Sequence, residues 1–166
     1  RWTVLPDFPL FWTAGRLALD NPRLIYDTEA LTAAQAWAVD PSRGPRPFAY
    51  PPSALLLFVP FAVIPFWVAY WSWLALSTLA FWSAVRRVAS GWAVPLSMTA
   101  PHVVLALILG QTSLILGSLI IWGLSLVRER PLLAGILLGA AVAVKPQRVL
   151  LAPVAMISGG HWRTLV

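Results

Sequence analysis

Residues 132–158 contain two uncharged apolar runs that are separated only by the Lys-Pro-Gln-Arg segment at 145–148. Each run can form a helix of roughly 20 Å at 1.5 Å per residue, which is short of the ~30 Å hydrocarbon core of a bilayer. A proline and two cations at such a join are tolerated only where they face water, protein or an anionic ligand. The sequence therefore predicts two short helices, about 132–145 and 147–160, with a polar pocket at their join that opens to one membrane face.

Composition supports a membrane protein. The chain is 59% hydrophobic and 11% charged, whereas an ordinary soluble domain has about 25% charged residues. Residues 1–46 hold five basic and five acidic residues, so the net charge of +6 comes from basic residues that punctuate the later apolar runs. This distribution is typical of helix orientation in a bilayer and argues against nucleic acid as a partner.

Cysteine and histidine usage limits the possible chemistry. The chain has no cysteine and two histidines, so we expect no disulfide, no metal site and no cofactor. It begins with Arg1 rather than methionine and stops at Val166 in an apolar context, which indicates a fragment of a longer protein.

Residues 1–50 are the main polar region, and we expect them to form an extracytoplasmic loop with short amphipathic helices. The first helix begins after Asp7 and carries an apolar face that would lie on a membrane surface. The second covers about 29–39 and is capped by Asp27 or Thr28. The apolar face of the first helix consists of Phe8, Phe11, Trp12, Gly15 and Leu19.

Residues 51–166 are expected to be a transmembrane helical region. Its prolines favour a short embedded helix at 53–59 and then a full span at about 66–85. The next uncharged run breaks near a Gly-Gln pair and predicts two spans, about 90–109 and 112–127. The expected fold is thus all-α, a multi-span helical bundle that is incomplete in this chain.

Basic residues at 86–87, 128–130 and 161–163 fall on one side of this topology, as expected for the cytoplasmic side. Residues 1–50 and the 145–148 join then lie on the extracytoplasmic side. In the first short helix, small residues at four-residue spacing predict close packing on a neighbouring helix. These small residues are Gly135, Gly139 and Ala143.

Three charged residues are the main candidates for chemistry. Asp7 is either a helix N-cap or a general base that takes a proton from an acceptor hydroxyl, and the two roles are compatible. Lys145 and Arg148 are three residues apart, so on one helical turn both can bind a phosphate. Snorkelling to the membrane interface is the alternative, and it suits Arg148 nearly as well as phosphate binding does.

Four polar residues are weaker candidates for the same pocket. Gln111 is either a pocket residue or a helix cap, and Tyr50 is either a pocket residue or part of a rigid corner before two prolines. His102 is expected to be a hydrogen-bonded interior histidine rather than a catalyst. Gln147 lies within the charged join.

The order of several short motifs resembles glycosyltransferase family 87, which belongs to the GT-C class of multi-span membrane enzymes that use polyprenyl-phosphate sugars. Each motif is weak alone, but their order between hydrophobic runs is fairly specific. The motifs are Asp7-Phe8 with Trp12, Ala14 and Gly15, then Ile25-Tyr26-Asp27, Phe48-Ala49-Tyr50-Pro51-Pro52, Pro60, Pro65, Gly110-Gln111 and Lys145-Pro146-Gln147.

The resemblance implies a GT-C-like enzyme of a prokaryotic plasma membrane that transfers mannose, or a similar sugar, to a lipid or glycan hydroxyl. The acidic residue of the first outer loop is the base of an inverting displacement in this family, and that role falls on Asp7. Lys145 matches a position suited to the donor phosphate. The partners implied are a polyprenyl-phosphate sugar donor, an acceptor and membrane lipids, with no nucleic acid.

Two other functions fit the same sequence. A transporter or lipid flippase also uses short broken helices with a charged midpoint, and it would form no covalent product. A purely structural membrane subunit would tolerate substitution of both Asp7 and Lys145.

Overall fold

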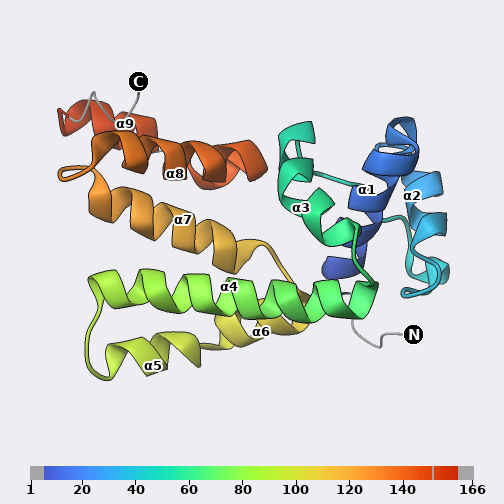
Figure 1. Cartoon of the computed structure of the whole chain (residues 1–166), viewed down its shortest axis with the longest axis horizontal. Helices are drawn as coiled ribbons and strands as arrows, with labels where there is room; N and C mark the ends of the chain where they lie inside the picture. Colours follow the sequence, from blue (N-terminus) through green and yellow to red (C-terminus); the bar gives the residue numbers. More distant parts are fainter. Residues whose placement is uncertain (1–5, 151, 161–166) are drawn as a thin grey trace. The chain divides into compact units, whose positions relative to one another are not determined.

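The computed structural model describes residues 6–150 and 152–160, which form helices joined by loops without a β-strand (Figure 1). The all-α class predicted from the sequence is therefore confirmed. The α-helices in this part of the chain are α1 (Phe8–Asp20), α2 (Thr28–Ala34), α3 (Leu55–Ala62), α4 (Phe66–Val88), α5 (Ala93–Met98), α6 (Pro101–Leu109), α7 (Ser113–Leu126), α8 (Pro131–Val144) and α9 (Ala152–Ser158). Single 3₁₀ turns are η1 (Pro22–Leu24), η2 (Pro41–Arg43), η3 (Pro52–Ala54) and η4 (Pro146–Arg148).

The described residues divide into two compact units. The first contains residues 6–76 and 105–111, and the second contains residues 77–104, 112–150 and 152–160. Helices α4 and α6 each contribute to both units.

Close contact between α1 and α3 forms the centre of the first unit. A Cβ atom added at Gly15 would lie 2.7 Å from the Cβ of Ala62 and 3.1 Å from the carbonyl oxygen of Phe58. The ring of Phe11 stacks on that of Phe58 with centroids 4.5 Å apart. Helix α1 is amphipathic, as expected. Most of its apolar face is covered by other parts of the protein, so the expectation that this whole face lies on a membrane surface is wrong. Leu19 alone of the predicted face is exposed.

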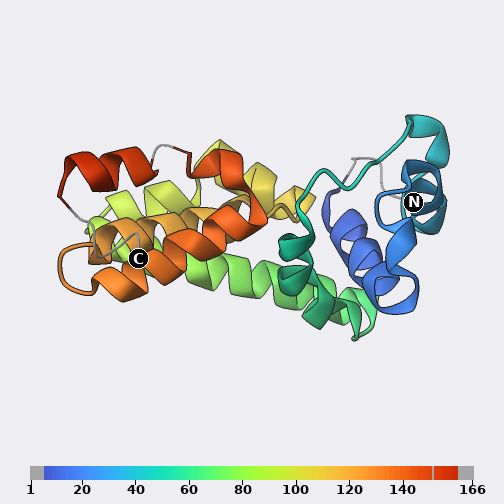
Figure 2. The ribbon, with the colours of Figure 1, turned by 90° about the horizontal axis from the view of Figure 1, so that it is seen from above.

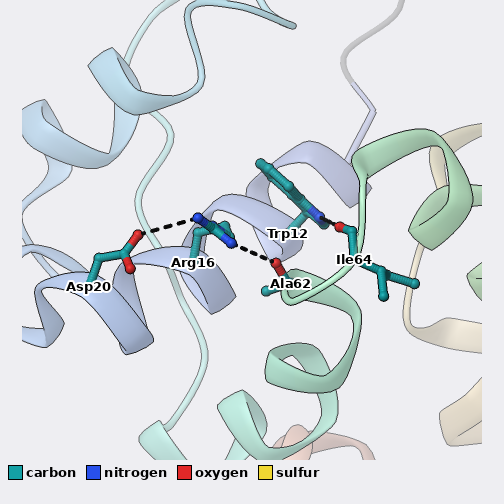
Figure 3. A network of polar contacts seen from close by, with 5 residues as sticks. All are labelled: Trp12, Arg16, Asp20, Ala62 and Ile64. Atoms are coloured by element: carbon teal, nitrogen blue, oxygen red, sulfur yellow. Dashed lines mark hydrogen bonds and ion pairs between the residues drawn. The ribbon is translucent and has the colours of Figure 1, made fainter.

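Side chains of α1 also bind the chain where α3 ends (Figure 3). The indole N–H of Trp12 donates to the carbonyl of Ile64 at 3.2 Å, and Arg16 donates to the carbonyl of Ala62 at 3.4 Å. Arg16 also lies 3.8 Å from the carboxylate of Asp20, one turn further along α1. The carbonyls at the end of a helix have no intrahelical partner, so these two bonds satisfy groups that otherwise need water.

Helix α2 is shorter than the predicted 29–39 segment. Of the two predicted caps, Asp27 is the N-cap and Thr28 is the first helical residue. The Asp27 carboxylate accepts hydrogen bonds from the N–H groups of Glu29 and Ala30 at 3.0 Å. The helix ends at Ala34 because the buried side chain of Gln35 donates to the carbonyl of Leu31, and the chain turns there. Side-chain bonds of this kind compete with continuation of the helix.

Helix α4 has 23 residues, which corresponds to about 35 Å at 1.5 Å per residue. It is the one helix among the described residues that is long and apolar enough to cross a membrane. The predicted span at 66–85 corresponds to it, and the predicted short helix at 53–59 corresponds to α3, which lies one turn later in the sequence.

The predicted single span at 90–109 is wrong. The structure has two short helices there, α5 and α6, with a break at Thr99 and Ala100. Pro101 is the first residue of α6, and a residue before proline is disfavoured in helical conformation. The hydroxyl of Thr99 donates to the carbonyl of Pro95, which satisfies one carbonyl at the end of α5.

Helices α7 and α8 form an antiparallel pair in the second unit, and Figure 2 shows this pair from above. A Cβ atom added at Gly123 would lie 2.7 Å from the Cγ of Leu138 and 3.3 Å from the carbonyl oxygen of Ala134. Met156 of α9 packs with Leu126 and Ala134 where α7 ends and α8 begins.

The small-residue face predicted for α8 is not the face that contacts α7. A Cβ atom at Gly139 would meet nothing within 4 Å, and Gly139 is exposed. The buried face of α8 instead consists of Ala134, Leu138, Ala141 and Val144. The close approach of α7 and α8 therefore comes from Gly123 on α7, and packing of the Gly135, Gly139 and Ala143 face on another helix stays a prediction.

Candidate functional site

Asp7 lies at the start of α1, and two features hold it there. Its backbone N–H donates to the carbonyl of Leu109 at 2.7 Å, and its φ and ψ of −85° and −28° continue into the helix. Asp7 occupies the N-cap position, but its side chain makes no capping hydrogen bond, so the capping role expected for its carboxylate is wrong. That side chain is 34% exposed and pairs with an arginine from another part of the chain.

The arginine is Arg46, which is not among the site residues predicted from the sequence. Its Nη2 atom donates to the carbonyl of Pro6 at 2.6 Å and lies 3.9 Å from Oδ1 of Asp7. The Arg46 side chain is 13% exposed. Burial lowers the pKa of Arg46, and the carboxylate of Asp7 opposes that lowering. The sequence signal that could have identified it is a lone arginine between two prolines, immediately before the Phe48-Ala49-Tyr50 motif.

The turn at Gly110 packs directly against the start of α1. Gly110 has a φ of +64°, and a Cβ atom there would lie 2.7 Å from the Cβ of Phe8. The indole N–H of Trp73 donates to the carbonyl of Gly110 at 3.1 Å. The backbone N–H of Gln111, the next residue, donates to the carbonyl of Ala106 at 2.9 Å. The fold thus brings the Gly-Gln motif and the Asp-Phe motif together, although they lie far apart in the sequence.

Tyr50 belongs to the aromatic cluster beneath α1. Its ring meets Phe11 edge-on with centroids 5.3 Å apart and Phe58 with centroids 6.0 Å apart. The hydroxyl of Tyr26 donates to the backbone carbonyl of Tyr50 at 3.0 Å. This bond links the segment before α2 to the segment before η3. Asp7, Tyr50 and Gln111 therefore all lie in the first unit.

The charged join between α8 and α9 lies in the second unit. Lys145 ends α8, and its N–H donates to the carbonyl of Ala141 at 3.0 Å. The N–H of Arg148 donates to the carbonyl of Lys145 at 3.0 Å, which closes the η4 turn and brings these two residues close together. Lys145 is half-buried, whereas Gln147 and Arg148 are exposed. The predicted pocket shared by Asp7 and Lys145 stays a prediction.

His102 lies in the second unit, near the start of α6, and it is exposed. The expectation of an interior histidine is therefore wrong. Pro101, the residue before His102, starts α6 within the segment where a single span was expected.

Within residues 6–150 and 152–160, no three His, Asp or Glu side chains are grouped so that they could hold a metal ion. The expectation that the protein has no metal site stays a prediction.

Over residues 6–150 and 152–160, these features define an all-helical architecture with one helix long enough to cross a membrane and a carboxylate held at the start of another helix. Residues 48–166, more than half of the chain, match the model of glycosyltransferase family 87. The chain belongs to this family and is a glycosyltransferase, an enzyme that requires a sugar donor and an acceptor. Asp7 and Arg46 precede the matched segment. No curated protein and no solved structure matches the chain.

Proposed function

We propose that this glycosyltransferase is a multi-span membrane enzyme that moves mannose, or a similar sugar, from a polyprenyl phosphate to a hydroxyl of a lipid or glycan. The reaction takes place on the extracytoplasmic face of a prokaryotic plasma membrane. Family membership, the apolar α4 helix and the order of the sequence motifs support this proposal.

The proposed chemistry is a single inverting displacement with Asp7 as the base. The carboxylate takes the proton of the acceptor hydroxyl as the hydroxyl oxygen attacks the anomeric carbon of the donor. The bond between that carbon and the phosphate oxygen breaks, and polyprenyl phosphate leaves with the electron pair. The new glycosidic bond then has the opposite anomeric configuration.

Lys145 and Arg148 are proposed to bind the donor phosphate. The η4 turn brings the two residues close together, and cations offset negative charge that develops on a leaving phosphate. The lipid tail would lie among apolar helices while the phosphate stays at the interface. No metal or cofactor has a role in this proposal.

The observation that carries the proposal is the state of the Asp7 carboxylate. It is partly exposed, it makes no capping bond, and it sits at a backbone position fixed by the hydrogen bond from its N–H to Leu109. A carboxylate that was only a helix cap would use its oxygens on the N–H groups of the first turn.

The proposed orientation places the C-terminal end of α4 and the α7–α8 turn on the cytoplasmic side. Nε of Arg87 donates to the hydroxyl of Ser125 at 3.0 Å, so the ends of α4 and α7 are adjacent within the second unit. The guanidinium of Arg86 lies 4.7 Å from the centre of the Trp82 ring, an arrangement suited to a membrane interface.

The test is sugar transfer by the full-length enzyme in membranes that contain radiolabelled polyprenyl-phosphate mannose. Asp7→Asn should abolish transfer and leave donor binding intact, whereas Asp20→Asn, on the exposed side of the same helix, should leave turnover unchanged. Lys145→Ala should weaken donor binding. Turnover near that of the parent in Asp7→Asn rejects the base. Donor movement without a new glycosidic product would instead indicate a transporter.

A further inference from the structure

The buried arginine beside Asp7 has no role in the chemistry described so far. We propose that Arg46 is a positioning residue, which fixes the orientation of the Asp7 carboxylate for proton transfer. This inference rests on the proposed role of Asp7 as the base. Arg46 would not touch the sugar or the phosphate, and its effect would pass through Asp7.

The path of the chain delivers Arg46 to this place. Pro45 and Pro47 flank the residue and restrict the backbone on both sides. The N–H of Arg46 donates to the hydroxyl of Thr32 at 3.0 Å, and that hydroxyl donates to the carbonyl of Thr28 at 2.6 Å. Helix α2 therefore anchors the backbone of Arg46, and the side chain reaches from there to the start of α1.

The guanidinium is held by two groups that belong to adjacent residues. Nη2 donates to the carbonyl of Pro6 at 2.6 Å, and the same atom lies 3.9 Å from Oδ1 of Asp7. The longer distance is that of an ion pair rather than a hydrogen bond. The positive charge can therefore orient the carboxylate without occupying it as a strong hydrogen-bond donor would.

This arrangement does not maximise stability. Arg46 is mostly buried, and its Nη1 atom is buried without a hydrogen-bond partner. A buried guanidinium with an unsatisfied N–H group costs free energy, and apolar replacements of buried ion pairs are often neutral or stabilising. An arginine used only for stability would not be expected to leave this N–H group unpaired. A role in orienting the base Asp7 gives a reason why an arginine is present at position 46 despite this cost.

The burial of the Arg46 guanidinium also limits which groups can bind to it. Nη1 is inaccessible to solvent, so a phosphate cannot reach this atom without movement of the surrounding residues. A direct role in donor binding is therefore less consistent with the structure than a role through Asp7.

The experiment compares five variants of the full-length enzyme, four with a single substitution and one with two. Arg46→Gln should lower kcat about 100-fold, because small displacement of a reacting group is enough for such a loss. Donor affinity and the melting temperature should stay close to those of the parent. Arg16→Gln is the matched control, since Arg16 also pairs with an aspartate and a backbone carbonyl in the same unit, and its kcat should be unchanged.

Arg46→Lys provides a second variant that keeps the charge. Lysine ends one bond earlier than arginine, so its ammonium falls short of the position of Nη2, which contacts both the Pro6 carbonyl and Asp7. We therefore expect kcat to fall about tenfold at normal donor affinity. If Arg46→Gln does not fold, the test rests on Arg46→Lys, for which a lower kcat at normal donor affinity supports the positioning role. In the Asp7→Asn background, Arg46→Gln should cause no further loss of the residual rate.

Three results would overturn the inference. These are a parent-like kcat in a folded Arg46 variant, a loss of donor affinity as the main effect, or an undiminished effect of Arg46→Gln in the Asp7→Asn background. A parent-like rate in Asp7→Asn would instead reject the base assignment in the proposed function. Loss of transfer in Asp7→Asn with a normal rate in Arg46→Gln would reject the positioning role alone.

Discussion

Gly110 shows how a single residue can set the position of the Asp7 carboxylate. Its positive φ suits glycine, and its missing Cβ atom leaves room for Phe8, the residue after Asp7. The carbonyl of Leu109, one residue earlier, accepts the hydrogen bond from Asp7. The same turn therefore provides both the space and the backbone acceptor that place the start of α1.

We expect Gly110→Ala to destabilise the protein more than Gly91→Ala. Both glycines have a positive φ, of 64° and 58°, so both variants carry the backbone cost of about 1–2 kcal/mol. Only the Cβ atom at position 110 meets Phe8, and such overpacking costs about 1–3 kcal/mol more. Thermal melting of the purified full-length enzyme measures the difference. Equal loss in both variants would show that the contact with Phe8 is unimportant.

Asp7 could be identified as a candidate from the sequence, whereas the signal for Arg46 is weak, a lone arginine between two prolines. A short acidic motif before an amphipathic helix is visible in the chain itself. The pairing of Asp7 with Arg46 depends on the fold of the intervening α2 segment and on the Thr32 hydroxyl, which no local pattern specifies.

At the scale of whole helices, the α7–α8 pair depends on one glycine of α7 rather than on the glycines of α8. Gly123→Ala would force the side chain of Leu138 to move and bring a methyl group near the carbonyl of Ala134. We expect a loss of about 1–3 kcal/mol. Gly139→Ala should be neutral or stabilising by about 0.5–1 kcal/mol, because alanine is the better helix former and the site is open. Chemical or thermal unfolding compares the two variants.

A loss in Gly139→Ala as large as that in Gly123→Ala would mean that the glycine face of α8 packs against another helix. A normal stability in Gly123→Ala would mean that Leu138 relaxes without cost. Either result would change the description of this helix pair.

Some helix boundaries followed from the caps and prolines of the sequence, and two others did not. Asp27, one of the two predicted caps, precedes α2, and Pro146 follows the end of α8 near the predicted boundary. The end of α2 depended on the buried Gln35 side chain, and the break before α6 depended on Pro101 within an otherwise continuous apolar run. In these two places a local polar or proline effect outweighed the hydrophobic pattern.

At the scale of the whole molecule, the orientation can be tested with single cysteines, because this chain has none of its own. Ser42, in the η2 turn, should react with a membrane-impermeant maleimide in intact cells when replaced by cysteine. Ser90, after the end of α4, should react only after permeabilisation. Both positions are exposed in the structure, so burial within the protein does not protect them. The enzyme without either substitution is the control.

The opposite pattern, with position 90 labelled and position 42 protected, would reverse the proposed orientation and place Asp7 on the cytoplasmic side. Labelling of both positions in intact cells would contradict a membrane crossing between them. The class of protein was predictable from composition and motif order, since these are properties of the chain as a whole.

The bonds from Trp12 and Arg16 to the end of α3 allow that helix to stop where little water is present. Backbone carbonyls left bare in hydrocarbon are strongly unfavourable, which normally prevents a short helical stub from ending below the lipid headgroups. Here the indole of Trp12 donates a hydrogen bond to the carbonyl of Ile64, and the guanidinium of Arg16 donates one to the carbonyl of Ala62. In the proposed membrane topology, this would let the chain turn at Pro65 and enter α4 without first returning to the aqueous phase.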